Sequence, residues 1–422
     1  MNAEFSTIDW ARSSNIYEIN VRQYTREGTF NAFANHLPRL KDMGVRILWF
    51  MPIHPIGRVN RLGSLGSYYS ISDYKAVNPE FGDLDDFRQL VNTAHGMGFK
   101  VIIDWVANHT AWDHVWTYTN KDYYQLDGNG NFRAPYDWND VIQINHDSKD
   151  QQDAMIDAMK FWLRECDIDG FRCDMAHLIP LSFWQRARKE LETIKHLFWL
   201  AETEDASYHE VFDATYTWEF LHKMEEYWRG QTDTAGLGSV LNKYKDSFPD
   251  DALRAYFTSN HDENSHSGSE YERMGDAAKI FAVLCATWNG LPLIYSGQEL
   301  PNKKRLRFFD KDEIEWIENC ELHNFYKTLL ELRSKNPALS SDKTVDTYLL
   351  KASDERVFCF LRKKGSNEVL VILNLSPGWL SFTIDSNNIA GNYKDVFSGE
   401  DIAINNNYLF HFSAWDYKVL EK

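Results

Sequence analysis

The stretch IDGFRCD (168–174) decides the fold, because it joins a short apolar strand to charged side chains. In a β-strand every second side chain faces the same side, so Gly170, Arg172 and Asp174 share one face and Phe171 points to the other. A buried parallel strand packs such an apolar face against helices and carries functional groups where it ends. We therefore expect a parallel α/β sheet with a polar site at the strand ends.

Seven further apolar runs alternate with helical patterns along the chain. The eight strand candidates are 16–21, 45–50, 100–106, 168–174, 197–202, 212–218, 255–260 and 291–297, and the main helical patterns are 30–44, 83–98, 150–166, 181–195, 218–245 and 276–288. Eight strands, each followed by a helical stretch, predict an α/β fold of the (β/α)8 TIM-barrel type. The length of 422 residues exceeds one core of usual size, so we expect a smaller domain as well.

Two segments depart from this alternation. Residues 108–149 are rich in Asn, Asp, Gly, Trp and Tyr and include the turn DGNGN, which predicts an insertion after strand three. After Pro337 the apolar period changes to two, which predicts a small antiparallel β domain. The predicted domains are a barrel (1–107 and 150–338), an inserted domain (108–149) and a C-terminal β-sandwich (341–422).

Composition excludes several classes of partner. The net charge of −17 argues against nucleic acid and anionic membranes, which both bind basic surfaces. No apolar run reaches the roughly 18 residues of a membrane span. Five scattered cysteines predict a reduced chain with neither a disulfide framework nor a zinc site. The first residues do not read as a signal peptide, so we expect a cytoplasmic protein as the sequence stands, or an exported one if a leader was removed. The oligomeric state stays open.

Charged side chains follow several of the predicted strands, where barrel enzymes carry their catalytic groups. They are Asp104, His109, Arg172, Asp174, Glu202, His261 and Asp262. One strand-end carboxylate alone reads as a loop salt bridge, but several at one rim indicate glycoside cleavage, which needs one ionised and one protonated carboxyl group. Arg172 favours the ionised form of Asp174, and the apolar run before Glu202 favours its protonated form.

Six motifs resemble the sequence signatures of glycoside hydrolase family 13, the α-amylase family. They are DWVANH (104–109), GFRCD (170–174), AETE (201–204) and TSNHDE (258–263), together with the segments 67–82 and 290–299. The resemblance covers most of the chain. It implies a (β/α)8 barrel with an inserted domain B after strand three and a C-terminal antiparallel β domain. It also implies a retaining hydrolase of α-1,4 bonds in starch, glycogen or malto-oligosaccharides.

The resemblance assigns roles to seven residues. It implies Asp174 as nucleophile, Glu202 as general acid/base and Asp262 as the carboxylate that holds the hydroxyls of the reacting sugar. It implies substrate contacts by Tyr69, His109, Arg172 and His261, and we add His177, which departs from the family pattern, as a further candidate for a substrate contact. The alternative interpretation of Tyr69 is an aromatic ring that only packs within its loop. For His177 the alternative is a loop histidine whose hydrogen bonds are made within the protein. Asp104 and Asn108 are expected to hold the loop after strand three. In the implied reaction a glycosyl ester forms on the nucleophile and water hydrolyses it, with the two carboxyl groups about 5 to 5.5 Å apart.

Three positions depart from the family pattern. Gln143 stands where an aspartate commonly binds calcium, and an uncharged amide holds a hard cation weakly. We therefore expect no cofactor and no tight calcium, with Asn108 as the one remaining ligand candidate. Met175 leaves the choice between α-1,4 and α-1,6 bonds open, and His177 with Leu178 replaces a lysine–histidine pair of many endo-acting amylases.

Three alternatives accompany this prediction. The first is an α-1,6-acting or transglycosylating enzyme with the same chemistry. The second is a non-catalytic carbohydrate-binding relative, against which the complete set of carboxylates argues. The third is a metal-dependent barrel hydrolase with His109, His261 and Asp262 as ligands. Such enzymes commonly carry a histidine pair on strand one, and the run 16–21 contains none.

Overall fold

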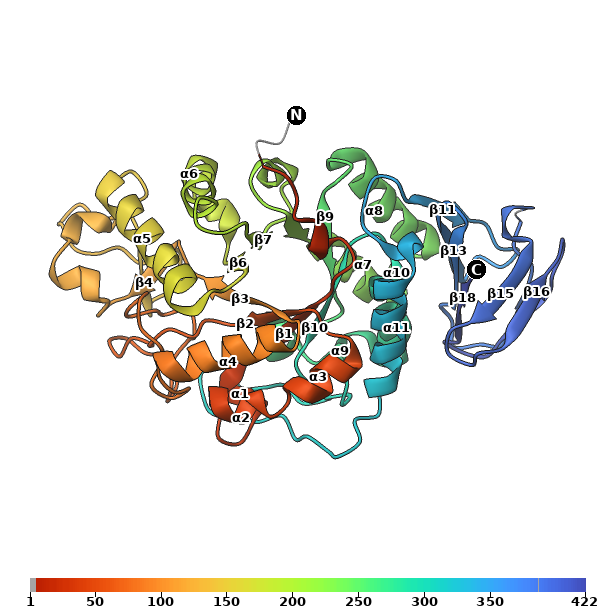
Figure 1. The fold of residues 1–422 in the computed structure, drawn as a ribbon, viewed down its shortest axis with the longest axis horizontal. Helices are drawn as coiled ribbons and strands as arrows, with labels where there is room; N and C mark the ends of the chain where they lie inside the picture. The colour runs from red at the N-terminus through yellow and green to blue at the C-terminus, as the bar shows by residue number, and fades with distance from the viewer. Residues whose placement is uncertain (1–4, 386) are drawn as a thin grey trace. The chain divides into compact units, whose positions relative to one another are not determined.

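The computed structural model describes residues 5–385 and 387–422, and it confirms the eight-stranded barrel (Figure 1). The strands form a closed barrel in the order β1-β10-β9-β8-β7-β6-β3-β2. Their bounds are β1 Ile16–Ile19, β2 Ile47–Phe50, β3 Lys100–Trp105, β6 Gly170–Cys173, β7 Phe198–Ala201, β8 Ala214–Tyr216, β9 Leu253–Tyr256 and β10 Leu291–Tyr295. Each lies within, or within two residues of, the predicted run.

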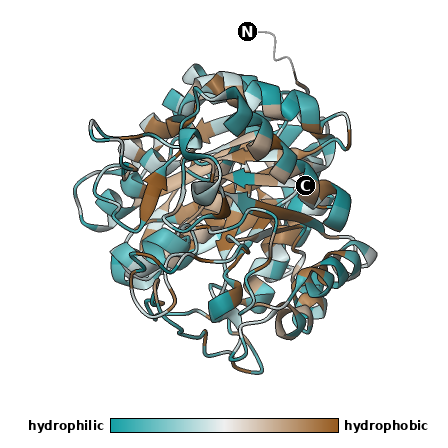
Figure 2. Ribbon diagram, turned by 90° about the vertical axis from the view of Figure 1, so that its left-hand side faces the viewer, coloured by the Kyte–Doolittle hydropathy of each residue, from teal (hydrophilic) through white to brown (hydrophobic). Residues whose placement is uncertain are grey.

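Apart from Lys100 at the start of β3, the barrel strands are buried along their whole length, which is typical of parallel strands covered by helices. Figure 2 accordingly shows hydrophobic residues concentrated in the strands, while the helices carry hydrophilic residues as well. Parallel pairing places Gly170 opposite Phe198. A Cβ atom at Gly170 would lie 2.0 Å from the Phe198 carbonyl oxygen, so only glycine allows the strands to approach this closely.

The helices differ from the prediction in three places. The helices in chain order are α1 Val21–Tyr24, α2 Phe30–Ala34, α3 Leu37–Met43, α4 Leu84–Gly96, α5 Lys149–Cys166, α6 Leu181–Leu191, α7 Trp218–Trp228, α8 Thr234–Ser247, α9 Glu270–Met274, α10 Ala278–Thr287 and α11 His323–Lys335. The predicted helix 30–44 divides at Asn35 and His36, and Pro38 lies in the first turn of α3, where a backbone N–H has no partner within the helix. The predicted helix 218–245 divides at Gly230, whose φ of 69° ends α7. Only a short 3₁₀ helix, Ala206–Glu210, separates β7 from β8.

The chain forms two compact units, and we describe each by itself. The first contains residues 16–216 and 304–316 with the described residues up to Ile8, and the second contains 9–15, 217–303 and 317–422. The insertion after β3 belongs to the first unit and holds an antiparallel pair, β4 His109–Ala111 and β5 Val141–Gln143. The boundaries proposed above for the three domains remain predictions.

The C-terminal part of the second unit is all β, as the change of period predicted. Its strands are β11 Asp346–Leu350, β12 Val357–Lys364, β13 Asn367–Asn374, β14 Leu380–Phe382, β15 Gly391–Asp395, β16 Asp401–Ile404, β17 Phe410–Phe412 and β18 Tyr417–Glu421. Six form an antiparallel sheet in the order β11-β12-β13-β18-β15-β16, and β14 pairs with β17. Leu370, Phe382 and Phe412 share one apolar core, so both sheets contribute to it.

Two further features concern the chain as a whole. All five cysteines are free thiols, and four of them are buried. Within the described ranges, the helices are too short or too polar for one of them to cross a membrane.

Candidate active site

Arg172 is the centre of a buried cluster of charges in the first unit. Its Nη1 atom lies 3.0 Å from Asp104 Oδ1 and 3.1 Å from Asp174 Oδ1, and its Nη2 atom lies 2.8 Å from Glu202 Oε2. The strand register explains the convergence, because Arg172 pairs with Asp104 across β3 and β6, and Glu202 directly follows β7. The sequence predicted the contact with Asp174. It did not predict that the same guanidinium contacts the other two carboxylates.

The surroundings of Arg172 keep it charged. Burial alone would lower its pKa, but the carboxylates of Asp104 and Glu202 outweigh burial and raise the pKa well above its usual value. The indole ring of Trp49 lies 5.0 Å from the guanidinium carbon, and the Nε atom donates a hydrogen bond to the Tyr216 hydroxyl at 3.3 Å. The cation is therefore held by carboxylates, an aromatic face and a hydroxyl.

Asp104 holds this cluster together and does not face solvent. Its side chain is fully buried, and its Oδ2 atom accepts hydrogen bonds from Trp49 Nε1 at 3.2 Å and from the Tyr69 hydroxyl at 3.1 Å. It also accepts from Arg172 through both oxygens. These contacts with Arg172 and Tyr69 make Asp104 a positioning residue, and its predicted role in holding the loop after strand three stays a prediction.

Asp174 and Glu202 are the carboxylates at the edge of the cluster, each with 6% of its surface exposed. Glu202 Oε2 accepts a hydrogen bond from the Met175 backbone N–H at 2.8 Å. Met175 adopts a left-handed conformation with φ 42° and ψ 45°, which is rare for a bulky residue and is typical of functional sites. The sequence singled out Met175 for its side chain, whereas the structure shows its backbone contacting the predicted acid/base. Glu202 thus has two polar contacts that the apolar run before it did not predict.

The sequence-predicted binding residues of this unit differ in burial. Tyr69 is 9% exposed, and His109 is 4% exposed with its Nδ1 atom 3.2 Å from Asn108 Nδ2. Burial lowers the pKa of His109 to about 4, so its imidazole is neutral and offers one donor and one acceptor. His177 has an exposed side chain instead. The structure therefore brings Tyr69 into the cluster around Arg172 and leaves His177 at the surface.

His261 and Asp262 belong to the second unit, in which they follow β9. His261 is 1% exposed, and its Nε2 atom lies 3.3 Å from Asp262 Oδ2. The Asp262 side chain is 38% exposed, so its carboxylate is accessible to a ligand. Their predicted roles beside the other site residues stay predictions.

Asn108 and Gln143, which stand where the family pattern has calcium ligands, do not make a suitable donor set for that ion. Asn108 is 1% exposed, and its Oδ1 atom has no hydrogen-bond partner among the described residues. The strand pairing sets Gln143 opposite His109, next to this asparagine. Calcium takes six to eight oxygen ligands and usually several carboxylates. Over residues 5–385 and 387–422 no cluster of three acidic, histidine or cysteine side chains is arranged to hold a metal, so we derive no step through one.

Comparison with protein families matches the chain over most of its length. The alpha amylase catalytic domain matches residues 9–143 and 129–319, and the alpha amylase C-terminal all-beta domain matches residues 349–413. The chain belongs to the alpha-amylase family, glycoside hydrolase family 13. Members of this family share the barrel and the C-terminal β domain described above, which confirms the predicted fold class.

The curated relatives compared with the chain are 23 to 26% identical to it, and the similar solved structures are 17 to 28% identical. The alpha-amylase MalA of Haloarcula japonica is 26% identical over 94% of this chain, and the chain spans 61% of the length of that relative. The crystal structure of an alpha-amylase from Lactobacillus plantarum superposes with a TM-score of 0.89 at 26% identity, covering 98% of this chain and 100% of that one. The maltogenic alpha-amylase AmyB of Thermotoga neapolitana gives a TM-score of 0.85 at 28% identity, covering 97% and 96%.

Proposed function

We propose that this member of the alpha-amylase family is a retaining hydrolase of α-1,4-glucosidic bonds in starch, glycogen or malto-oligosaccharides. One observation carries the proposal: the guanidinium of Arg172 contacts both Asp174 and Glu202, at 3.1 and 2.8 Å. Two carboxylates on one small cation lie close together. Retaining glycosidases need such closeness, whereas inverting ones leave room for a water between the two groups.

In the first step Asp174 attacks the anomeric carbon and forms a glycosyl ester, while Glu202 gives its proton to the leaving oxygen. In the second step Glu202 takes a proton from water, which attacks the ester and releases the sugar with its original configuration. Arg172 supports this sequence because it orients Asp174 and offsets its negative charge.

Further residues would hold the sugar at the point of cleavage. The Tyr69 ring is fixed by its hydroxyl on Asp104 and can pack against the apolar face of a pyranose. His109 is neutral and can donate to a sugar hydroxyl. Asp262 and His261 follow β9, and we propose that they grip the hydroxyls of the same sugar, because strand ends of a parallel barrel meet at one rim.

The test uses the purified protein with amylose, pullulan, isomalto-oligosaccharides and sucrose, and resolves the products over time. We expect cleavage of amylose with initial products in the α configuration, which proton NMR distinguishes from the β form. Asp174→Asn should lower kcat/KM by about 10³-fold or more, because the nucleophile is lost. Asp250→Asn, at an exposed position, is the matched control and should behave like the wild type.

Product analysis also separates the alternatives. Release of pullulan fragments without cleavage of amylose would indicate an α-1,6 preference, and lengthened oligosaccharides would indicate transfer to a sugar acceptor. The proposed hydrolysis is refuted if none of the four substrates is cleaved, or if Asp174→Asn is as active as the wild type.

The five free cysteines support a reducing compartment, so we propose that the protein acts in the cytoplasm.

A further inference from the structure

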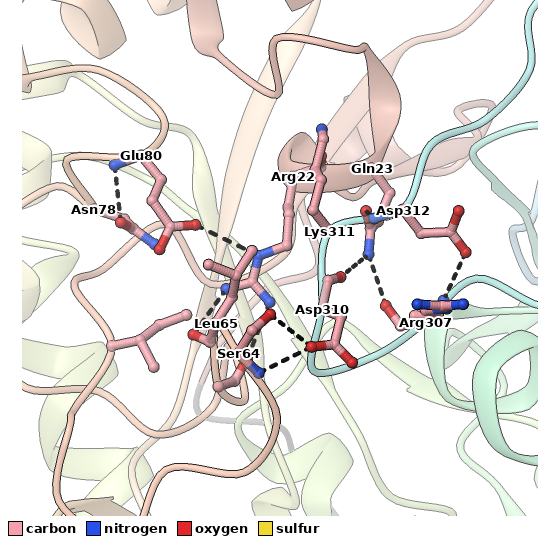
Figure 3. A network of polar contacts seen from close by, with 12 residues as sticks. Arg22, Gln23, Ser64, Leu65, Asn78, Glu80, Arg307, Asp310, Lys311 and Asp312 are labelled. Atoms are coloured by element: carbon pink, nitrogen blue, oxygen red, sulfur yellow. Dashed lines mark hydrogen bonds and ion pairs between the residues drawn. The ribbon is translucent and has the colours of Figure 1, made fainter.

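The segment Lys304–Trp316, here called the strap, follows β10 and is tied to α1, the short helix after β1 (Figure 3). Gln23 is fully buried, and its Nε2 atom donates to the carbonyl oxygens of Arg307 at 2.6 Å and Asp310 at 2.9 Å. Its Oε1 atom accepts from the backbone N–H of Asp312 at 2.6 Å. One buried amide side chain thus fixes three positions of the strap.

A second set of contacts ties the strap to the loop that carries Tyr69. The Nη1 atom of Arg22 donates to the carbonyl oxygens of Gly66 at 3.0 Å and Phe308 at 3.4 Å. The Asp310 carboxylate accepts from the backbone N–H of Ser64 at 2.9 Å and from its hydroxyl at 2.6 Å (Figure 3). Arg22 is 2% exposed, so its own bonds are shielded from water, whereas the bonds between Asp310 and Ser64 lie at the exposed surface. Together the two sets hold the strap and the loop of Tyr69 in a fixed register.

This register sets the rings of Phe308 and Tyr69 parallel to each other. Their planes differ by 8°, and their centroids are 6.4 Å apart. Rings stacked face to face in van der Waals contact lie about 3.5 to 4 Å apart, so a centroid separation of 6.4 Å means that these two parallel rings are displaced sideways. Neither ring therefore covers the other, and Phe308 is only half-buried. The pair offers two neighbouring aromatic faces, displaced sideways from each other.

The barrel order shows on which side of the predicted acid/base this second face lies. In the closed sequence of eight strands, β1 and β7 are four places apart and therefore opposite each other. Glu202 directly follows β7, whereas the strap is bonded to Arg22 and Gln23 in α1, the helix after β1. Phe308 thus belongs to the wall opposite the group that protonates the leaving sugar.

We infer that Phe308 is a specificity residue, which binds the glucose unit next to the one held by Tyr69, on the side that stays on the enzyme when the bond is cut. The inference rests on the proposed function. The apolar C–H face of a pyranose packs on an aromatic ring, and two parallel rings displaced sideways suit two consecutive glucose units. A chain with two such units would therefore be bound by both rings and one with a single unit by Tyr69 alone.

The test compares release of nitrophenol from 4-nitrophenyl α-maltoside and 4-nitrophenyl α-glucoside. Release from the maltoside needs two glucose units on the retained side, and release from the glucoside needs one. For Phe308→Ala we expect the ratio of kcat/KM for the maltoside to kcat/KM for the glucoside to fall about tenfold. The fall should come from a lower kcat/KM for the maltoside, with the value for the glucoside unchanged. Phe308→Tyr keeps the aromatic face and should keep the ratio within twofold of the wild type.

Phe309→Ala is the matched control, since this neighbouring strap residue packs edge-on against Phe308 with ring centroids 5.0 Å apart. An unchanged ratio in Phe308→Ala refutes the inference. So does an equal fall in Phe309→Ala, because the effect would then come from disturbing the strap. A wild type that releases nitrophenol from neither substrate and cleaves no glucan refutes the proposed function instead, and that result is known before the variants are compared.

Discussion

His54 should make the protein less stable in mild acid, and replacing it by phenylalanine should remove part of that loss. The side chain is fully buried, and neither ring nitrogen has a hydrogen-bond partner among the described residues. It is surrounded by the rings of Tyr74, Trp105 and Trp162, with centroids 6.0, 5.6 and 5.3 Å away. Burial lowers its pKa from 6.5 to about 3, because an imidazolium here would lose its hydration without gaining a partner.

The size of the effect follows from proton linkage. The unfolded chain protonates this histidine below pH 6.5 and the folded chain only near pH 3, so the unfolded chain binds more protons between these values. The free energy of unfolding therefore falls as the pH falls from about 6.5 towards 3. At pH 5.0 the loss is about 2 kcal/mol for this one side chain. His114 and His109, with pKa values lowered to about 3 and about 4, add losses in the same direction.

The assay is urea unfolding of the wild type and His54→Phe at pH 7.5 and 5.0, followed by tryptophan fluorescence. Any change in packing affects both pH values alike, so it cancels when the pH-dependent loss of the variant is subtracted from that of the wild type. Buried carboxyl groups with raised pKa values, such as Asp213 and Glu270, cancel in the same way. We expect the wild type to lose about 2 kcal/mol more than the variant. A difference below about 0.5 kcal/mol would refute the reasoning, and His411→Gln, at an exposed histidine, should give no comparable difference.

Three further outcomes follow from the site and the barrel. Asp104→Asn removes a buried charged partner of Arg172. We therefore expect the free energy of unfolding, measured by heat or urea, to fall by about 3 kcal/mol and kcat/KM to fall by about 10²-fold. A variant with wild-type stability would contradict the role of Asp104. Gly170→Ala forces a Cβ atom against the Phe198 carbonyl, and it should cost about 3 kcal/mol or more or prevent soluble expression, which a normal unfolding curve would disprove. EDTA should leave Tm within about 1 °C, because Asn108 and Gln143 make a poor calcium set, and a large drop in Tm would show a bound metal.

The barrel could be predicted because its signal is local and repeats eight times. Each strand is a short apolar run, and burial on both faces leaves no polar alternation that would disguise it. The divided helices were missed because 30–44 and 218–245 keep apolar spacing across their breaks. The strap was missed for a different reason: Gln23 and Arg307 are 284 residues apart, and no periodicity reports a contact over such a distance.

The site was predictable in its membership and less so in its geometry. Strand alternation placed Arg172 beside Asp174, and the strand ends named Asp104 and Glu202. The bridging of all three carboxylates by one guanidinium depends on the register of β3, β6 and β7, which a sequence does not report. The role of the Met175 backbone depends on a left-handed conformation that propensity would not assign to methionine.

Burial therefore has two different electrostatic outcomes in the same unit. The active site offsets its charges with Arg172, whereas His54 and His114 are tolerated only because they stay neutral. Activity measured in mild acid then falls as folded protein is lost. His54→Phe shifts the acid limit of stability and leaves the carboxylates on Arg172 in place. An acid limb of the rate profile that moves with this variant therefore reports unfolding, and one that stays has another origin than the burial of His54.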